Sequence, residues 1–297
     1  MKSLRTLEAH FENLPDYDFT PNYCEVGEGL RLHYVDVGEE SARTIILMHG
    51  EPSWSYLYRF MIRQLSAEGF RVLAPDLIGF GKSDKPSEFS DYSYTSHVAW
   101  MQAWLDHVDV SEAVLFCQDW GGMIGLRLVA ENPEKFAAVM AANTGLPIGK
   151  GKPLEAFLKW QEFAKLVPVF PTGQVLQGAT VRELTPEEVA AYDAPYPDET
   201  YKAGARIFPA LVPTDPSMEG VAENLEAWKV LKAWEKPFLT SFSDQDPVSK
   251  GGEKIFQKLI PGAQGQPHEI LKGGGHFLQE DVHAELSEKL IELCARL

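Results

Sequence analysis

Short apolar runs alternate with amphipathic stretches along most of this chain, and that alternation constrains its fold more than any single motif. The runs are bounded by polar or glycine-containing segments, as buried parallel strands are, at residues 44–48, 72–74, 113–117, 137–141, 237–242 and 268–271. Stretches of helical length lie at residues 54–67, 94–108, 123–132, 252–259 and 285–297. This order predicts a doubly wound, mostly parallel α/β sheet, with its functional crevice at the carboxyl ends of the strands.

Two regions depart from the alternation. Residues 30–37 alternate apolar and polar at period two after a glycine-containing turn at 27–29, which predicts a hairpin and a strand at the sheet edge. Residues 146–215 are dense in proline and aromatic residues, and no buried strand is evident among them. We therefore expect a helical cap domain at 146–215, inserted into a main domain formed by residues 1–145 and 216–297.

Composition limits the classes of partner. The formal charge of −16 argues against nucleic acid and anionic membrane surfaces, which repel an acidic protein. Three scattered cysteines, Cys24, Cys117 and Cys294, form neither a disulfide framework nor a zinc motif. The N-terminal residues lack a signal-peptide apolar region, and no segment reaches the length of a membrane span. We expect a cytoplasmic monomer.

A lone carboxylate, Asp119, lies between the apolar run 113–117 and the pair Gly121-Gly122. A nucleophile occupies this place in the sharp strand-to-helix turn of the G-x-S-x-G type. Cys117 stands where that motif has its first glycine, so the motif by itself is weak. Asp119 is thus either a nucleophile or an ordinary N-cap for the following helix.

An acid and a histidine follow in the order that a hydrolase triad requires. Asp246 comes after the run 237–242, and His276 follows the next run behind three glycines. Taken singly, Asp246 could be a turn residue with Asp244 competing for its role, and His276 an exposed loop residue. Their arrangement after predicted strands favours a triad of Asp119, Asp246 and His276.

An aspartate nucleophile suits attack on saturated carbon, because the resulting ester can be hydrolysed whereas a serine ether cannot. The backbone N–H groups of Glu51 and Trp120 would form the oxyanion hole for that hydrolysis. His276, oriented by Asp246, would activate the water. His49 is better interpreted as a packed, hydrogen-bonded loop residue than as a catalytic one.

Four segments closely resemble haloalkane dehalogenases, and the likeness runs nearly from end to end: residues 49–59, 76–86, 118–122 and 275–280. The resemblance implies an α/β-hydrolase fold with a helical cap, and a halide-binding indole at Trp120. Glu51 stands where one branch of the family has a second, asparagine ligand. The cap segment around Trp160 resembles the branch with a cap tryptophan, so Trp160 is the expected second ligand, or else packs the cap against the main domain.

The same resemblance implies a substrate pocket and two alternatives. The pocket positions are Phe157, Phe208, Pro209 and Val248, any of which could instead be core. A small haloalkane, water and the halide product are the implied partners, with no metal or organic cofactor. The alternatives are an epoxide hydrolase, whose cap tyrosines would be Tyr192, Tyr196 and Tyr201, and a non-catalytic receptor for a small apolar ligand.

Overall fold

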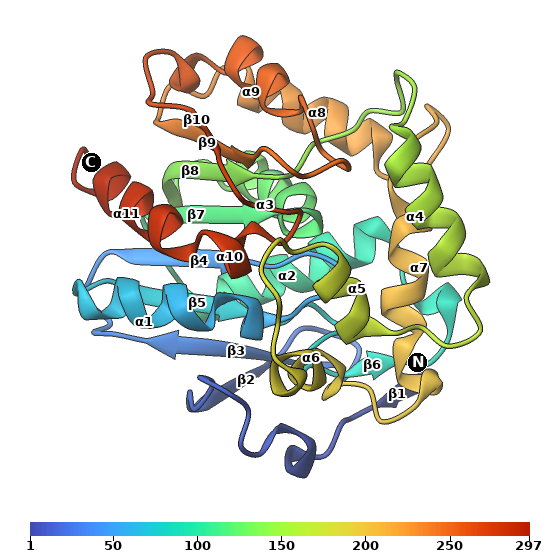
Figure 1. The fold of residues 1–297 in the computed structure, drawn as a ribbon. Helices are drawn as coiled ribbons and strands as arrows, with labels where there is room; N and C mark the ends of the chain where they lie inside the picture. Colours follow the sequence, from blue (N-terminus) through green and yellow to red (C-terminus); the bar gives the residue numbers. More distant parts are fainter.

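The computed structural model describes all residues from Met1 to Leu297 and is built around an eight-stranded sheet (Figure 1). The strands lie in the order β10-β9-β8-β7-β4-β5-β3-β2. Their bounds are β2 (Pro21–Glu25), β3 (Arg31–Val37), β4 (Thr44–Met48), β5 (Arg71–Pro75), β7 (Ala113–Gln118), β8 (Phe136–Ala142), β9 (Phe238–Ser243) and β10 (Glu269–Leu271). A separate antiparallel pair joins β1 (Ser3–Leu4) to β6 (Lys85–Pro86).

The six strands from β10 to β5 are parallel, as the apolar runs predicted. Every residue of β4 and β7 is buried, because helices cover both faces of the sheet and leave no solvent-facing side that would need polar residues. The predicted hairpin of β2 and β3 is confirmed, but the prediction that β3 lies at the edge is wrong. β3 pairs with β5 as well as with β2, so β2 is the edge strand.

Helices cover the two faces of this sheet. α1 (Arg59–Ala67) packs against α11 (His283–Cys294) on one face, and α3 (Trp120–Glu131) packs against α2 (Tyr94–Val108) and α8 (Val221–Leu231) on the other (Figure 1). Two shorter helices, α9 (Glu253–Leu259) and α10 (Leu278–Asp281), follow β9 and β10. The 3-10 helices of the chain span Glu8–Phe11, Ser55–Tyr58, Phe89–Asp91, Glu199–Lys202 and Pro261–Ala263. None of the helices combines the length and apolar character that a membrane crossing requires.

Four helices with no strand among them follow β8. They are α4 (Glu155–Leu166), α5 (Thr172–Gly178), α6 (Pro186–Asp193) and α7 (Ala203–Leu211), and they lie together at one end of the sheet (Figure 1). A single cluster of 80 buried hydrophobic residues includes members from these helices and from the sheet, so both parts share one core.

A buried charge network also joins the helical region to the rest. The guanidinium of Arg59, on α1, donates to Glu188 on α6 at 2.8 Å and to Glu280 on α10 at 2.6 Å. Arg182 donates to the same two carboxylates, and the Tyr192 hydroxyl donates to Glu280. Breaking such a buried network by removing one partner is strongly destabilising, so it holds α6 firmly against α1 and α10.

Strand register places the important loops at one level. In the parallel pairs, Met48 is opposite Cys117 and Gln118 is opposite Ala142. The residues that follow β4, β7 and β8 therefore meet at one edge of the sheet, beside the loops that follow β9 and β10. This is the crevice that the doubly wound topology predicts.

Candidate active site

Asp119 lies at a sharp turn between β7 and α3. Its backbone has φ 51° and ψ −125°, a conformation that side chains rarely adopt, and α3 begins at the very next residue. Helix α3 thus begins three residues earlier than the sequence pattern predicted, because the turn needs no connecting loop. The Asp119 side chain makes no cap hydrogen bond to α3, so the interpretation as an ordinary N-cap is wrong.

Two glycines make the turn possible. A Cβ atom at Gly121 would lie 2.1 Å from the carbonyl oxygen of Met48, and one at Gly50 would lie 2.3 Å from Oδ1 of Asp119. Neither backbone could approach so closely with a larger residue. Cys117, at the other glycine position of the usual motif, is fully buried in β7, where a side chain fits.

The carboxylate of Asp119 is held by one loop and faces another. Its Oδ1 accepts a hydrogen bond from the backbone N–H of Glu51 at 2.8 Å. Its Oδ2 lies 3.4 Å from Nε2 of His276. The hydroxyl of Thr144 donates to the Asp119 backbone carbonyl at 2.7 Å, which anchors the turn to the end of β8. One carboxylate oxygen is thus engaged by an amide, and the other is directed at the imidazole.

His276 lies between two carboxylates. Its Nδ1 is 3.1 Å from Oδ1 of Asp246, on the side opposite Asp119. Burial lowers the pKa of His276, but Asp246 and Asp119 together raise it more, so the imidazole has a pKa of about 10. While both carboxylates are ionised, the histidine therefore carries a proton at neutral pH.

The structure distinguishes Asp246 from its neighbour Asp244. Asp246 is buried, and its carboxylate also accepts hydrogen bonds from Val248 N–H at 2.8 Å and from the N–H and hydroxyl of Ser249. Burial raises the pKa of Asp246, but His276 and these donors lower it by more, so the pKa is about 2. Asp244 is exposed and accepts the N–H of Gly273 instead. Of these two neighbouring aspartates, only Asp246 faces the histidine.

Two residues that the sequence analysis did not single out hold the His276 loop. The amide of Asn143 donates to the carbonyls of Gly275 and His276, both at 3.0 Å, and to Ser243 at 2.8 Å. The amide of Gln118 donates to the His276 carbonyl at 3.1 Å. The only sequence signal is their place at the ends of β8 and β7, since neither side chain belongs to a triad.

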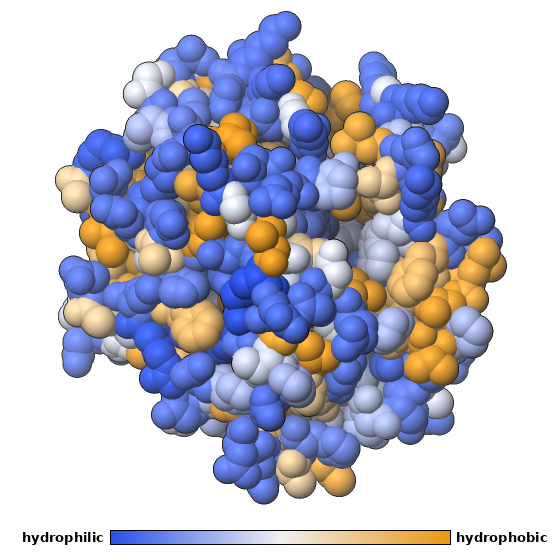
Figure 2. Space-filling view, viewed as in Figure 1, coloured by the Kyte–Doolittle hydropathy of each residue, from blue (hydrophilic) through white to orange (hydrophobic).

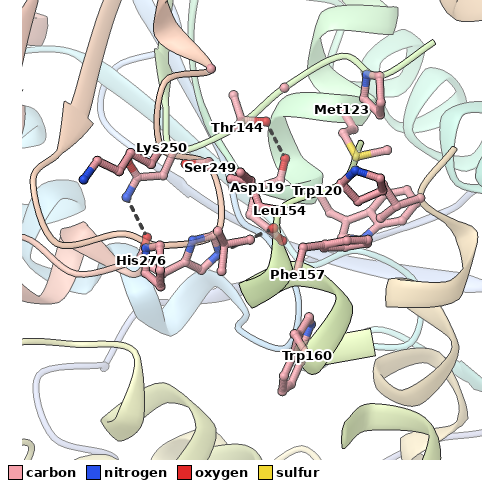
Figure 3. Close-up of a pocket in the computed structure, with 18 of the residues that line it drawn as sticks. Asp119, Trp120, Met123, Thr144, Leu154, Phe157, Trp160, Ser249, Lys250 and His276 are labelled. Carbon is pink, nitrogen blue, oxygen red and sulfur yellow. Dashed lines mark hydrogen bonds and ion pairs between the residues drawn. The ribbon is translucent and has the colours of Figure 1, made fainter. Parts of the chain in front are cut away.

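A cavity of about 940 Å³ opens above these residues. Asp119, Trp120 and His276 line it from the edge of the sheet, and Phe157 and Trp160 line it from α4 (Figure 3). Figure 2 shows the surface hollowed beside α4. The volume is within the range of small-molecule sites.

Of the four expected pocket residues, Phe157, Pro209 and Val248 line the cavity. Phe208 does not lie among the lining residues. It is fully buried on α7 and packs against the indole of Trp120, with ring centroids 4.6 Å apart. Its neighbour Pro209 takes the place on the cavity wall because successive residues of a helix point in different directions.

Trp160 lines the cavity, but its indole N–H is already engaged. It donates to Oε2 of Glu51 at 3.2 Å, while the ring packs against Phe163 and Phe170. Trp120 packs against Tyr94 with ring centroids 5.4 Å apart. Both indoles therefore line one cavity, and that of Trp160 is hydrogen-bonded to Glu51.

Other expected residues lie away from the cavity. His49 is fully buried, with Nδ1 2.9 Å from the Gly50 carbonyl and Nε2 accepting the Leu77 N–H at 2.9 Å, so its interpretation as a packed loop residue is confirmed. The cap tyrosines Tyr192, Tyr196 and Tyr201 are all absent from the cavity lining. A tyrosine acid for opening an epoxide ring is therefore not available there.

Comparison with known proteins agrees with this geometry. Residues 43–281 match the family described as alpha/beta hydrolase fold, so the chain is an α/β hydrolase. It is 52% identical to a haloalkane dehalogenase of Psychrobacter cryohalolentis and 48% identical to one of Mycolicibacterium paratuberculosis, in each case over 98% of both chains. The solved structure of the tetrameric haloalkane dehalogenase DpaA from Paraglaciecola agarilytica superposes with a TM-score of 0.89, at 34% identity and with 97% of both chains covered.

The chain belongs to the haloalkane dehalogenases. It is a hydrolase that removes halide from haloalkanes with water as co-substrate. The predictions of an α/β-hydrolase fold and of this activity are therefore confirmed, and the epoxide hydrolase and silent-receptor alternatives lose their support.

Proposed function

We propose that the enzyme works through a covalent ester on Asp119. Oδ2 of Asp119 attacks the carbon that bears the halogen, the carbon–halogen bond breaks, and halide departs with the bonding electrons. Water then attacks the ester carbonyl carbon and releases a primary alcohol. The observation that carries this proposal is the position of the carboxylate, with Oδ1 2.8 Å from an amide and Oδ2 3.4 Å from His276, on the cavity floor.

The engaged oxygen has a defined part in the second step. Once Oδ2 is alkylated, Oδ1 becomes the carbonyl oxygen of the ester and still accepts the Glu51 N–H. When water adds, negative charge develops on Oδ1, and the backbone N–H groups of Glu51 and Trp120 stabilise it. His276 takes the proton from water, and Asp246 orients the imidazole and stabilises the imidazolium.

We propose that the indoles of Trp120 and Trp160 hold the departing halide, which places the chain in the branch with a cap tryptophan. Two neutral N–H donors in an aromatic cavity bind an anion without a full positive charge that would retain it. Trp160 must release Glu51 to take part, since its N–H donates to the Glu51 carboxyl group in this structure. Phe157, Pro209 and Val248 would surround the alkyl chain.

An isotope experiment tests the mechanism. In a single turnover in H₂¹⁸O, with enzyme in excess over a 1-bromoalkane, the product alcohol takes its oxygen from Asp119 and the label enters the Asp119 carboxylate. Mass spectrometry of the peptide and the alcohol distinguishes this from direct attack of water on the alkyl carbon, which would label the alcohol at once.

The His276→Ala variant provides the matching trap. It should release one equivalent of bromide and accumulate an adduct on the peptide that contains Asp119, because alkylation does not need a base and hydrolysis does. Asp119→Ala is the control and should release no bromide. Steady turnover by the histidine variant would contradict the role proposed for His276.

We further propose the organisation predicted above: a main domain of residues 1–145 and 216–297, a cap of residues 146–215, and a cytoplasmic monomer. All three cysteines are buried free thiols, which suits a reducing compartment. Light scattering after gel filtration tests the monomer. The surface that would oppose a monomer is the exposed apolar stripe of α4, formed by Leu158, Phe163 and Leu166. Figure 2 shows hydrophobic side chains beside the hollow.

A further inference from the structure

The side chain of Glu51 lies in the active site and is not used by the mechanism above. It is 4% exposed and lines the cavity beside Asp119. Its Oε2 accepts the indole N–H of Trp160 at 3.2 Å, and its Oε1 is buried with no hydrogen-bond partner at all. An unpartnered buried oxygen is costly unless some ligand satisfies it, so this atom indicates a place for a ligand contact.

The surroundings of Glu51 favour the neutral acid. Burial and the negative charge of Asp119 both raise the pKa of Glu51 well above its usual range, against smaller opposing effects from Trp160 and His276. No lysine or arginine pairs with it. A neutral carboxyl group has one O–H donor, and since Oε2 accepts from the indole, the proton resides on Oε1.

The position of this acid relative to Trp160 matters for halide. An ion that takes the Trp160 N–H must lie next to the oxygen that now accepts it, so it contacts the Glu51 carboxyl group. An ionised carboxylate there would repel the halide, and a neutral acid would attract it. We propose that Glu51, as the neutral acid, donates its O–H to the leaving halide as a third donor beside the two indoles; this role rests on the halide site of the proposed function.

Halide binding then depends on one proton. The ion binds tightly while Glu51 is protonated and is expelled as rising pH ionises it. Other titratable groups line the same cavity, and a control must separate their effect: Asp119, His276, Lys150, Lys152 and Lys250. The pKa of His276, about 10, lies above the pH range of the test below.

Bromide binding to the resting enzyme tests the proposal without turnover. Quenching of tryptophan fluorescence by sodium bromide, at constant ionic strength and from pH 5 to 9, gives a Kd for the wild type, Glu51→Gln and Glu51→Leu. The glutamine amide keeps a donor and cannot ionise, so Glu51→Gln should bind bromide with little dependence on pH. Wild type should match Glu51→Gln at low pH and bind bromide more weakly at high pH, and Glu51→Leu should bind about 10-fold more weakly than Glu51→Gln at every pH.

The opposite result has a clear meaning. If Glu51 only competes with halide for the Trp160 N–H, Glu51→Leu binds bromide more tightly than wild type at pH 5, and the proposal is overturned. Identical pH dependence of the bromide Kd in wild type and Glu51→Gln overturns the proposal as well. The comparison of these two proteins tests the proposal even if the leucine variant does not fold. Trp120→Phe tests the halide site itself: undiminished bromide binding in that variant would contradict the proposed function rather than the role of Glu51.

Discussion

Loss of the negative charge on Asp119 should lower the pKa of His276 sharply, and this change would switch the histidine from an acid to a base during each turnover. In the free enzyme the imidazole lies 3.4 Å from Oδ2 of Asp119 and has a pKa of about 10. Two unit charges at that separation interact by about 5 kcal/mol at an effective dielectric constant of about 20. Because 1.36 kcal/mol corresponds to one pKa unit, the pKa should fall by about 3 to 4, to roughly 6 to 7.

Ester formation removes this charge, since alkylation neutralises the carboxylate. His276 then releases a proton to solvent and becomes neutral above roughly pH 7, as a base for water must be. The proton balance is complete: an ionised Asp119 and a protonated His276 become an ester and a neutral imidazole, with one halide ion and one proton released. At pH 8 the first turnover should therefore release about one proton per active site together with the bromide burst.

Three measurements check this reasoning. NMR titration of the His276 imidazole should give a pKa near 10 in the wild type and one lower by about 3 to 4 in Asp119→Asn, which mimics the neutral ester. An indicator dye should record the proton burst. Rapid-quench decay of the alkyl-enzyme should slow as pH falls through roughly 6 to 7, because protonation then removes the base. An unchanged His276 pKa in Asp119→Asn, or ester decay that is independent of pH from 5 to 9, would refute the coupling.

Three further variants have defined outcomes. Trp120→Phe keeps the ring but loses the N–H, so bromide should bind about 10- to 100-fold more weakly by fluorescence quenching. Asp246→Asn should leave the bromide burst in place and slow ester hydrolysis by about 100-fold or more in rapid-quench assays. The fold lowers the pKa of Asp246 to about 2, so ionised Asp246 stabilises the folded state above pH 4, and this stabilisation is lost as the pH falls towards 2. In urea unfolding, the free energy of unfolding of wild type should therefore fall by about 2 kcal/mol between pH 5 and 2 through this group, and Asp246→Asn should lack that contribution. Glu280→Ala leaves the buried Arg59 short of a partner and should lower the free energy of unfolding by about 3 to 5 kcal/mol, whereas a change under 1 kcal/mol would show that the network contributes little.

The main elements of the fold were predictable because their causes are local. A strand buried on both faces must be apolar throughout, and the runs at β4, β7 and β8 therefore stand out in the sequence. The prediction that β3 is an edge strand was wrong, because β3 lies between β5 and β2. An alternating pattern shows that one face of a strand is partly exposed, and it does not show how many strands pair with it.

The candidate triad was predictable from the chain order of its residues, but the choice between Asp244 and Asp246 was not. Asp246 and Asp244 are two residues apart, and both follow β9, so composition could not separate them. The backbone decides: Asp246 turns inward to His276, and Asp244 turns outward to Gly273. Asn143 has no motif and was overlooked, although it supports the His276 loop through two carbonyls.

By itself, the sequence determined which chemical groups the enzyme possesses and the order in which they follow the strands along the chain. Periodicity and chain order are properties of neighbouring residues, so both can be seen in the sequence. Only the tertiary structure decided which of those groups meet. The hydrogen bond from Trp160 to Glu51 joins α4 to the loop after β4 across 109 positions, and Phe208 faces Trp120 rather than the cavity. Such contacts depend on how α4 and α7 pack over the sheet, and packing angles and side-chain directions at long range leave no periodic signal in the sequence.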